Sequence, residues 1–522
     1  MHSGIVAGMR RAIGLVLGMV SCYGGQVASE LGPGSSAAGD APSTSAVQGS
    51  GEPGGTAATG GDASGGTGSG AGSTGSGSTG GSDGLPLGEL PPLRFAVIGD
   101  FGIDGEAEAD VATRVASWDP ELILTVGDNN YYDGLDSTID VNIGKYYQRF
   151  IAPYVGAYGP GASENRFFPC PGNHDWNSGA LQGYLDYFTL PGNERYYRVR
   201  RGPVEFFLLD SDTHEPDGAV LGSVQAQWLE AGLSDSEASF QVVLMHHAPY
   251  SSGLHNGATA MRWPFAAWGA DLVIAGHDHD YERIVVDGLP YLVVGTGGAA
   301  LRPFDSEEVG SQRGHADVFG ALRVEATAKL MTLDFVATWG ARVDRLTIAA
   351  ESPASWQQLV SPTATWRYLE MLPGPDWSTL DYAEPWPAGP APLGFGVGGE
   401  GTTLVGGVAL DRPITTYFRH RFHAAAEDLG GPLRLRIAVD DGALIRLNGE
   451  EVYRINLSEG TVHDQTHAAA VVGDWFPGRV SETLIPGEAL RVGDNVLAVE
   501  VHQYSRVSTD LRLELELSAP RY

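Results

Sequence analysis

Two histidines one residue apart, His277 and His279, directly follow the apolar run from Leu272 to Gly276. An apolar run of this length is typical of a strand that is buried in a core. A strand that ends in His-x-His brings two imidazoles close to one point, although a core needs neither of them. Because imidazoles serve both as metal ligands and as hydrogen-bonding groups, the pair alone indicates either a metal site or a hydrogen-bonded strand end.

Four more apolar runs end in polar or ionisable residues in the same way. They begin at residues 93, 122, 167 and 241, and they precede Asp100, then Asp128 and Tyr131, then Asn173, His174 and Asp175, and finally His246 and His247. Taken singly, such residues are typical of turns and helix caps. In open α/β sheets, however, ligands bind beyond the carboxyl ends of the strands. Five strand ends of this kind therefore predict one site at which these side chains meet.

The segments between the apolar runs must place those strand ends next to one another. The segment from Glu106 to Ser117 is predicted to be a helix, and such helices would form covering layers over a sheet. Residues 196–210 predict a hairpin and strand, and residues 289–298 predict a further strand that ends in a glycine loop. We expect residues 136–161, which show less regular patterning, to form a rim or lid.

Together the five patterns resemble those of the calcineurin-like metallophosphoesterases, and specifically the purple acid phosphatases. They are Asp-x-Gly at 100–102, Gly-Asp-x-x-Tyr at 127–131, Gly-Asn-His-Asp at 172–175, Val-x-x-His at 243–246 and Gly-His-x-His at 276–279. The resemblance extends from Leu93 to Ala350. It implies an α/β (α+β) metallophosphoesterase domain over residues 91–350, built as a four-layer sandwich of two mixed sheets flanked by helices.

The resemblance further implies two metal ions. One would be held by Asp100, Asp128, Tyr131 and His279, and the other by Asp128, Asn173, His246 and His277, so that Asp128 bridges them. Two carboxylates and a phenolate suit a hard trivalent ion, whereas an amide and two imidazoles suit a divalent ion. We therefore expect Fe(III) in the tyrosinate site and Fe(II), Zn or Mn in the other.

Two histidines outside the ligand set are expected to contact the substrate. His174 stands where the family has a substrate-contacting histidine, and His255 follows His246 by nine residues, which is the family spacing for another. The resemblance implies that they stabilise phosphate oxygens and that His255 assists the leaving group. The alternative for His255 is an exposed loop histidine.

Two neighbours of the expected ligands are assigned supporting roles. Counting back four residues from Tyr250, as in the family, selects His246 as the ligand and leaves His247 beside it. We expect Asp175 to orient an imidazole rather than to bind metal.

The amino-terminal residues 1–22 resemble an export signal. Arg10 and Arg11 precede a short apolar stretch and then Ser21-Cys22, a pattern similar to that of bacterial lipoproteins in which the cysteine is lipidated. A plain cleaved signal peptide is the alternative. Residues 23–86 are rich in Gly, Ser and Thr and predict a disordered linker. We expect an extracytoplasmic protein that is secreted, periplasmic or anchored to a membrane through its lipid.

Composition limits the class of partner. The chain has 522 residues, of which 42% are hydrophobic, enough for two or three domains. Its formal charge of −32 argues against nucleic acid or an anionic membrane surface as the main partner.

Residues 351–522 predict an all-β sandwich, because strand-like segments there follow one another without helices. The region resembles the jelly-roll, carbohydrate-binding-like modules of secreted bacterial proteins, so a glycan or cell-surface ligand and a purely structural role are both open. Every expected ligand precedes residue 350. We therefore expect that removing this region leaves hydrolysis of a small phosphomonoester largely intact.

The resemblance implies a phosphatase that hydrolyses phosphomonoesters by attack of a metal-activated hydroxide. A phosphodiesterase or nucleotidase on the same core is one alternative, and a surface-binding protein with a degenerate catalytic domain is another. The complete set of seven expected ligands argues against degeneration.

Overall fold

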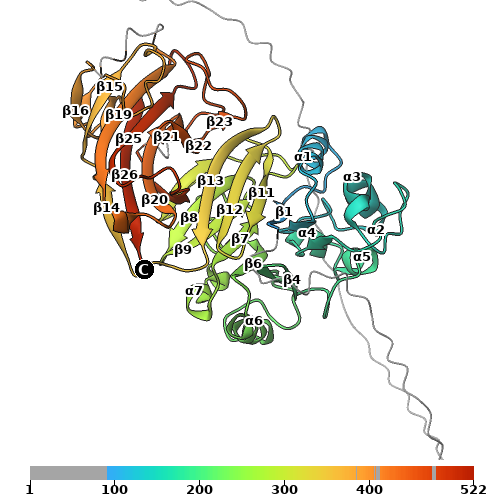
Figure 1. The fold of residues 1–522 in the computed structure, drawn as a ribbon. Helices are drawn as coiled ribbons and strands as arrows, with labels where there is room; N and C mark the ends of the chain where they lie inside the picture. The colour runs from blue at the N-terminus through green and yellow to red at the C-terminus, as the bar shows by residue number, and fades with distance from the viewer. Residues whose placement is uncertain (1–90, 384, 405, 407–411, 473–477) are drawn as a thin grey trace, which may run out of the picture. The chain divides into compact units, whose positions relative to one another are not determined.

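The computed structural model describes residues 91–522 except 384, 405, 407–411 and 473–477. The expected export signal with Cys22 and the expected linker at 23–86 lie outside the described residues. Within the described part, no helix is both long and apolar enough to cross a membrane. The described strands form two seven-stranded sheets and two six-stranded sheets (Figure 1).

The first two sheets are mixed, as the resemblance predicted. The first sheet contains β1 (Leu93–Ile98), β2 (Leu122–Thr125), β3 (Phe167–Pro169), β11 (Gly320–Ala326), β12 (Leu330–Ala337), β13 (Ala341–Ala349) and β23 (Leu457–Ser458). The second contains β4 (Tyr197–Arg201), β5 (Val204–Leu208), β6 (Phe240–His247), β7 (Leu272–Gly276), β8 (Tyr281–Val286), β9 (Leu289–Val294) and β10 (Ser311–His315). In the first sheet β1, β2 and β3 run parallel, and in the second β5, β6, β7 and β9 do, while the other pairs are antiparallel.

The apolar runs are continuous because both faces of the second sheet are buried. Along β6, Val242 and Leu244 face the core that it shares with the first sheet, whereas Val243 and Met245 face a separate core. The helices α6 (Val224–Asp235) and α7 (Phe265–Trp268) contribute to this separate core (Figure 1). A strand covered on both faces needs apolar side chains at every position, which explains why these strands do not alternate.

The remaining helices cover the first sheet and form the rim. The helix α1 (Glu106–Ser117) has the predicted bounds and packs against β11. Residues 136–150 form the short helices α2 (Asp136–Ile139) and α3 (Lys145–Tyr147), a π-helical turn at 140–144 and a 3-10 turn at 148–150, so this segment is irregular, as expected. The helices α4 (Asn173–Trp176) and α5 (Gln182–Tyr187) follow β3.

The carboxyl-terminal region is all-β, as predicted. One of its sheets contains β14 (Ser355–Val360), β17 (Leu393–Phe395), β18 (Thr402–Thr403), β20 (Leu433–Asp440), β24 (Ser481–Ile485) and β26 (Leu511–Arg521). The other contains β15 (Thr365–Leu369), β16 (Ala388–Pro390), β19 (Thr415–Ala424), β21 (Gly442–Leu447), β22 (Glu450–Ile455) and β25 (Gly493–His502). Apolar side chains from both sheets share one core, which makes the region a β-sandwich.

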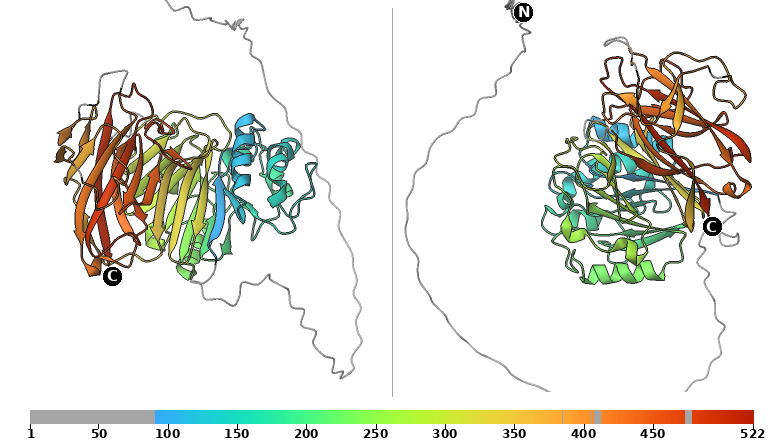
Figure 2. Two further views of the ribbon diagram at one scale, coloured as in Figure 1. Left: turned by 45° about the horizontal axis from the view of Figure 1, so that its top comes forward. Right: turned by 90° about the vertical axis from the view of Figure 1, so that its left-hand side faces the viewer.

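This region also contributes to the first sheet and its core. Strand β23 pairs with β13 at the edge of the first sheet, and Ala470 belongs to the core between the first two sheets. The buried Arg283 of β8 donates to the backbone oxygen of Glu482, 2.8 Å away. Figure 2 shows the orange-to-red strands beside the yellow strands β12 and β13. The prediction that residues 351–522 are dispensable for hydrolysis stays untested, but β23 and Ala470 show that this region completes the sheet and the core that precede it.

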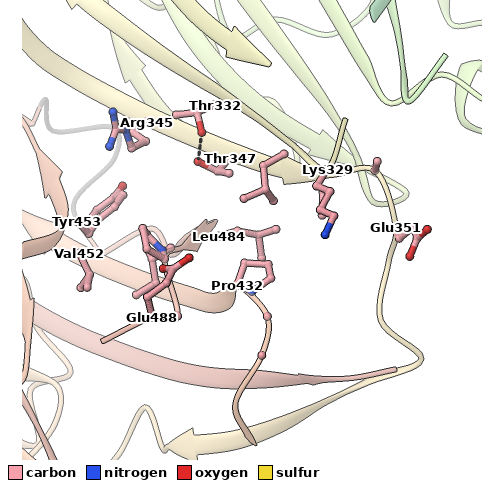
Figure 3. A pocket seen from close by; sticks show the side chains of 18 of the residues that line it. Lys329, Thr332, Arg345, Thr347, Glu351, Pro432, Val452, Tyr453, Leu484 and Glu488 are labelled. Carbon is pink, nitrogen blue, oxygen red and sulfur yellow. Dashed lines mark hydrogen bonds between the residues drawn. The ribbon is translucent and has the colours of Figure 1, made fainter. Parts of the chain in front are cut away.

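A cavity of about 740 Å³ lies between the two regions (Figure 3). Lys329, just before β12, Thr332 in β12 and Arg345 in β13 line one side, and Tyr453 and Leu484 line the other. None of the expected metal ligands lines this cavity. It is therefore distinct from the site that the strand ends form.

Candidate metal centre

Sharp turns follow the strands that lead into the site. Asp100, Asp128 and His277 have φ angles of +55°, +51° and +73°, which place each of them in the left-handed region shortly after the end of its strand. Such conformations cost energy in residues with a side chain and cluster at functional sites. At Gly127, a Cβ atom would lie 2.6 Å from Nδ1 of His246, so only glycine lets that imidazole pack here. The backbone is thus strained where the expected ligands meet.

One group of side chains gathers around Tyr131. Its phenol oxygen lies 3.1 Å from Nε2 of His279 and 3.4 Å from Oδ1 of Asp100. His279 donates from Nδ1 to the backbone oxygen of Ala300, 2.8 Å away, so the lone pair of a neutral ring is on Nε2 and points into the group. Oxygen atoms of Asp100 and Asp128 and a ring nitrogen of His279 lie within 4.8 Å of one another.

A second group gathers around His246. This ring donates from Nδ1 to the backbone oxygen of Val126, 2.9 Å away, which leaves a lone pair on Nε2. That nitrogen lies 3.0 Å from Oδ1 of Asn173 and 3.3 Å from Oδ1 of Asp128. Nδ1 of His277 lies 3.1 Å from the same nitrogen. Several acceptor atoms therefore converge where a donor or a cation is required.

The electrostatics of both groups call for positive charge. Burial raises the pKa of the Asp100 carboxyl well above its usual range, and the charge of Asp128 raises it further. Burial also raises the pKa of Asp128 and of the Tyr131 phenol, and it lowers the pKa of His246. In the described part of the chain, no lysine or arginine forms a salt bridge with Asp100 or Asp128. Without a cation, these buried acids would be forced toward their neutral forms.

The donor set fits two metal ions. The first group offers carboxylates and a phenol, and the second offers an amide oxygen and two imidazoles, with Asp128 next to both. Hard oxygen donors suit a trivalent ion, and mixed nitrogen and oxygen donors suit a divalent one. The seven residues expected as ligands are therefore brought together, in two groups that share one carboxylate.

The two expected substrate histidines lie at the edge of these groups. His174 is held by Nδ1, which is 2.6 Å from the backbone oxygen of Tyr132, and its Nε2 lies 3.9 Å from Oδ2 of Asp128. The His255 ring lies 4.0 Å from the His277 ring, centroid to centroid. Nδ1 of His255 is 2.8 Å from Oδ1 of Asp278. Asp278 therefore holds the His255 ring beside His277, one of the expected ligands.

Asp175 has a different role from the one expected. Its carboxylate accepts hydrogen bonds from the backbone N–H of Gly172 at 2.8 Å and from the side-chain amide of Asn129 at 2.9 Å, and no hydrogen bond joins it to an imidazole. It therefore braces the turns next to Asp128 and Asn173. Helix α4 begins at Asn173, so Asp175 is its third residue. A side chain at that position turns back toward Gly172, the residue before the helix.

His247 lies beside the second group. Its Nδ1 is 2.9 Å from the hydroxyl oxygen of Ser211, while a ring nitrogen lies within 4.8 Å of the donor atoms of His246 and His277. Because Nδ1 of His247 contacts Ser211, the structure favours the expected position of His247 beside the ligands rather than among them.

The sequence patterns missed two polar residues of the site. Asp278, the middle residue of His-Asp-His, holds His255, and its other oxygen accepts from the hydroxyl of Ser251 at 2.6 Å. Arg302 brings a guanidinium nitrogen to 3.4 Å from Nε2 of His255. The sequence signal for Asp278 was its place between two expected ligands. Arg302 had no signal beyond the glycine loop that precedes it.

Residues 93–281 match the model of the calcineurin-like phosphoesterase family. The chain is 28% identical over 239 residues to the probable purple acid phosphatase 20 of Arabidopsis thaliana, a match that covers 40% of this chain and 52% of the relative. It is 23% identical over 249 residues to the tartrate-resistant acid phosphatase type 5 of Oryctolagus cuniculus, which covers 40% of this chain and 74% of the relative. The match to the first of these curated relatives thus spans about half of its length.

Among solved structures, the purple acid phosphatase PPD1 from yellow lupin seeds is similar to this chain. The sequence identity is 18%, the TM-score is 0.42, and the similar part covers 50% of this chain and 54% of that one.

Proposed function

Since the chain carries a calcineurin-like metallophosphoesterase domain with purple acid phosphatase homologues, we propose that it is a binuclear-metal phosphatase that hydrolyses phosphomonoesters. The observation that carries this proposal is the convergence of buried acceptor atoms at the strand ends. Nε2 of His246, Oδ1 of Asn173 and Oδ1 of Asp128 face one another at 3.0 and 3.3 Å. Asp128 Oδ1 also accepts the backbone N–H of His174 at 3.0 Å, but this one donor does not serve the other two atoms, and a metal ion satisfies all three together.

We assign the ligands as the family resemblance implies. One metal ion would be held by Asp100, Asp128, Tyr131 and His279, and the other by Asp128, Asn173, His246 and His277. When bound, two such ions supply Lewis acidity for the phosphoryl oxygens and activate water as the nucleophile. The tyrosine and carboxylates favour Fe(III) in the first site, with Fe(II), Zn or Mn in the second.

The other residues of the site bind the substrate and move a proton. In its protonated form, His174 would donate from Nε2 to a phosphate oxygen, because Nδ1 is already bonded to the backbone oxygen of Tyr132. Asp278 holds Nδ1 of His255, which leaves Nε2 to give a proton to the leaving alkoxide. His255 is thus the general acid, and Asp278 is its positioning residue.

The test combines metal analysis with a substrate comparison on the full-length protein. We expect two metals per chain including iron, and hydrolysis of phosphomonoesters in preference to bis(p-nitrophenyl) phosphate. His255→Ala should keep both metals and lose about 10²–10⁴-fold in rate on glycerol 2-phosphate, the order typical of general acid catalysis. The loss should be smaller on p-nitrophenyl phosphate, whose leaving group needs little protonation.

The exposed His463 provides a matched control, and His463→Ala should change neither metal content nor rate. Full activity on zinc or manganese without iron would contradict the metal assignment. Loss of metal in His255→Ala, or equal slowing on both monoesters, would contradict the role of His255.

We also propose that the enzyme acts outside the cytoplasm, held to a membrane through a lipid on Cys22. This rests on the sequence of residues 10–22 and on the linker composition alone. Lipid labelling that persists in Cys22→Ala would contradict it.

A further inference from the structure

The loop that follows β9 positions both an expected ligand and a cation. The backbone oxygen of Ala300 accepts from Nδ1 of His279 at 2.8 Å, and the backbone N–H of Arg302 donates to the oxygen of His279 at 3.1 Å. Farther along the same loop, the backbone N–H of Asp305 donates to the oxygen of Ser252, 3.0 Å away. The loop is therefore tied to the residues on either side of the site, and Arg302 is held at its edge.

Arg302 has no acidic partner. Within the described residues, no salt bridge joins its guanidinium to a carboxylate, and its one side-chain hydrogen bond is the long contact of 3.4 Å to His255. Nearby arginines differ: Arg262 pairs with Glu308 at 3.2 Å, and Arg283 pairs with Asp344 at 2.9 Å. Arg114 and Arg166 also lack a carboxylate, but their guanidinium groups donate to backbone oxygens at 2.7–3.4 Å, whereas Arg302 has no such bond among the described residues. Its fork of N–H donors is therefore available to an anion.

The position of Arg302 indicates which part of a substrate it would meet. The nearest nitrogen of its guanidinium lies next to Nε2 of His255, the atom that we assign to the leaving oxygen. The expected metal ligands and His174 gather around the reacting phosphate instead. A substrate group that Arg302 can reach therefore belongs to the leaving group.

We propose that Arg302 forms an anion subsite for the leaving group, so that the preferred substrates carry a second negative group next to the scissile oxygen. This inference rests on the proposed phosphatase function and names its substrate class. The second group is a carboxylate on the adjacent carbon or a second phosphoryl group, because both accept two parallel hydrogen bonds from a guanidinium. Simple alcohol phosphates would lack this contact.

A matched pair of substrates tests the subsite on the metal-loaded enzyme. Glycerol 2-phosphate and 2-phosphoglycerate differ in that a hydroxymethyl group of the first is a carboxylate in the second. We expect a higher kcat/KM for 2-phosphoglycerate, and we expect Arg302→Gln to reduce that preference by about 10–100-fold, the order of a charge-assisted hydrogen bond. Arg302→Lys should fall between the two, because lysine keeps the charge but not the fork.

Inorganic pyrophosphate, measured in parallel, separates the two sources of the anion. A preference for pyrophosphate over p-nitrophenyl phosphate that depends on Arg302 identifies a phosphoryl group, and a preference limited to 2-phosphoglycerate identifies a carboxylate. Arg262→Lys is the control, since its guanidinium is already paired with Glu308. It should leave the substrate preference unchanged, and thermal melts should show that all variants are folded.

Three outcomes would overturn the proposal. The first is a wild-type enzyme that hydrolyses monoesters without preferring a second anion, and the second is an Arg302→Gln variant that loses the same factor on both members of the pair. If the wild type hydrolyses no phosphoester, the proposed function fails by itself. In that case, the affinities of the metal-loaded protein for pyrophosphate and for phosphate test whether Arg302 forms an anion subsite. Equal affinities for the two anions would be the third outcome that overturns the proposal.

Discussion

Buried carboxylates follow strand ends in two regions of this protein, and their surroundings differ. Asp441, directly after β20, accepts from the backbone N–H of Val472 at 2.9 Å and from that of Tyr504 at 2.7 Å. Asp100 and Asp128 also accept backbone N–H groups, but they face a phenol and imidazole nitrogens as well. The comparison teaches that burial alone does not mark a metal site. Convergence with other acceptors does.

The direction of neighbouring strands explains the difference. The strands β1, β2 and β3 are parallel, and so are β6 and β7, so their carboxyl ends place side chains from several strands at one edge. The strand β20 runs antiparallel to both β24 and β26. Its carboxyl end therefore meets the beginning of a neighbour, and no further strand-end ligands accumulate there. A similar local pattern thus leads to a ligand cluster in one sheet and to a braced turn in the other.

The largest expected effect comes from removing the shared carboxylate. Asp128→Asn should lose at least one metal ion and at least about 10²-fold in kcat/KM, because a buried charge next to both groups disappears. Metal analysis of the purified variant and rates on glycerol 2-phosphate measure this.

The matched control is Asp441→Asn. It should retain both metals and lose stability instead, by about 1–3 kcal/mol, since one of its two backbone donors is left without an acceptor. Metal loss in this variant, or full metal content in Asp128→Asn, would contradict the comparison.

A smaller effect is expected where the two regions meet. Arg283→Ala leaves the fully buried Asp344 without its guanidinium, 2.9 Å away, and removes the bond to the oxygen of Glu482. Breaking a buried pair in this way typically costs about 3–5 kcal/mol. Denaturant unfolding followed in parallel with activity should show both regions losing stability together.

Arg436 offers a counterpart with an exposed guanidinium, 3.1 Å from Glu516, a carboxylate that Arg434 also approaches to 3.7 Å. Arg436→Ala should change the free energy of unfolding by less than about 1 kcal/mol, because the lost charge is solvated and Glu516 keeps Arg434. If Arg283→Ala behaved the same way, the two regions would be independent units, as the sequence patterns suggest.

The smallest expected effect concerns pH. Burial, reinforced by Asp441, raises the pKa of Asp440 to about 9. A raised pKa means that the stabilising contribution is complete below the unfolded value, near 4, and is lost as the pH rises toward 9. Asp440→Asn should therefore become more stable relative to the wild type as the pH rises from 5 to 9. Denaturant unfolding at both pH values measures this gain, and a constant difference between the proteins would contradict it.

The sequence alone was enough to predict the strands and the residues that meet at their ends. The apolar runs predict buried strands whatever surrounds them, because a strand covered on both faces needs apolar side chains throughout. The residues after β1, β2, β3, β6 and β7 were therefore recognisable from the order of residue types along the chain. The bounds of α1 were predicted as well, since its apolar spacing and the Asp119-Pro120 that follows it are local features.

Contacts between distant segments were decided only by the tertiary structure. The pairing of β23 with β13 joins residues about 115 positions apart in the sequence. Strand β23 has only two residues, too few for a local sequence pattern to predict this pairing. Asp175 proved to brace a turn because α4 begins at Asn173, and Arg302 lies beside His255 because its loop is bonded to His279 and Ser252. The types of ligand were thus a property of the sequence. Their supports, and the cation next to them, depend on which loops the folded chain brings together.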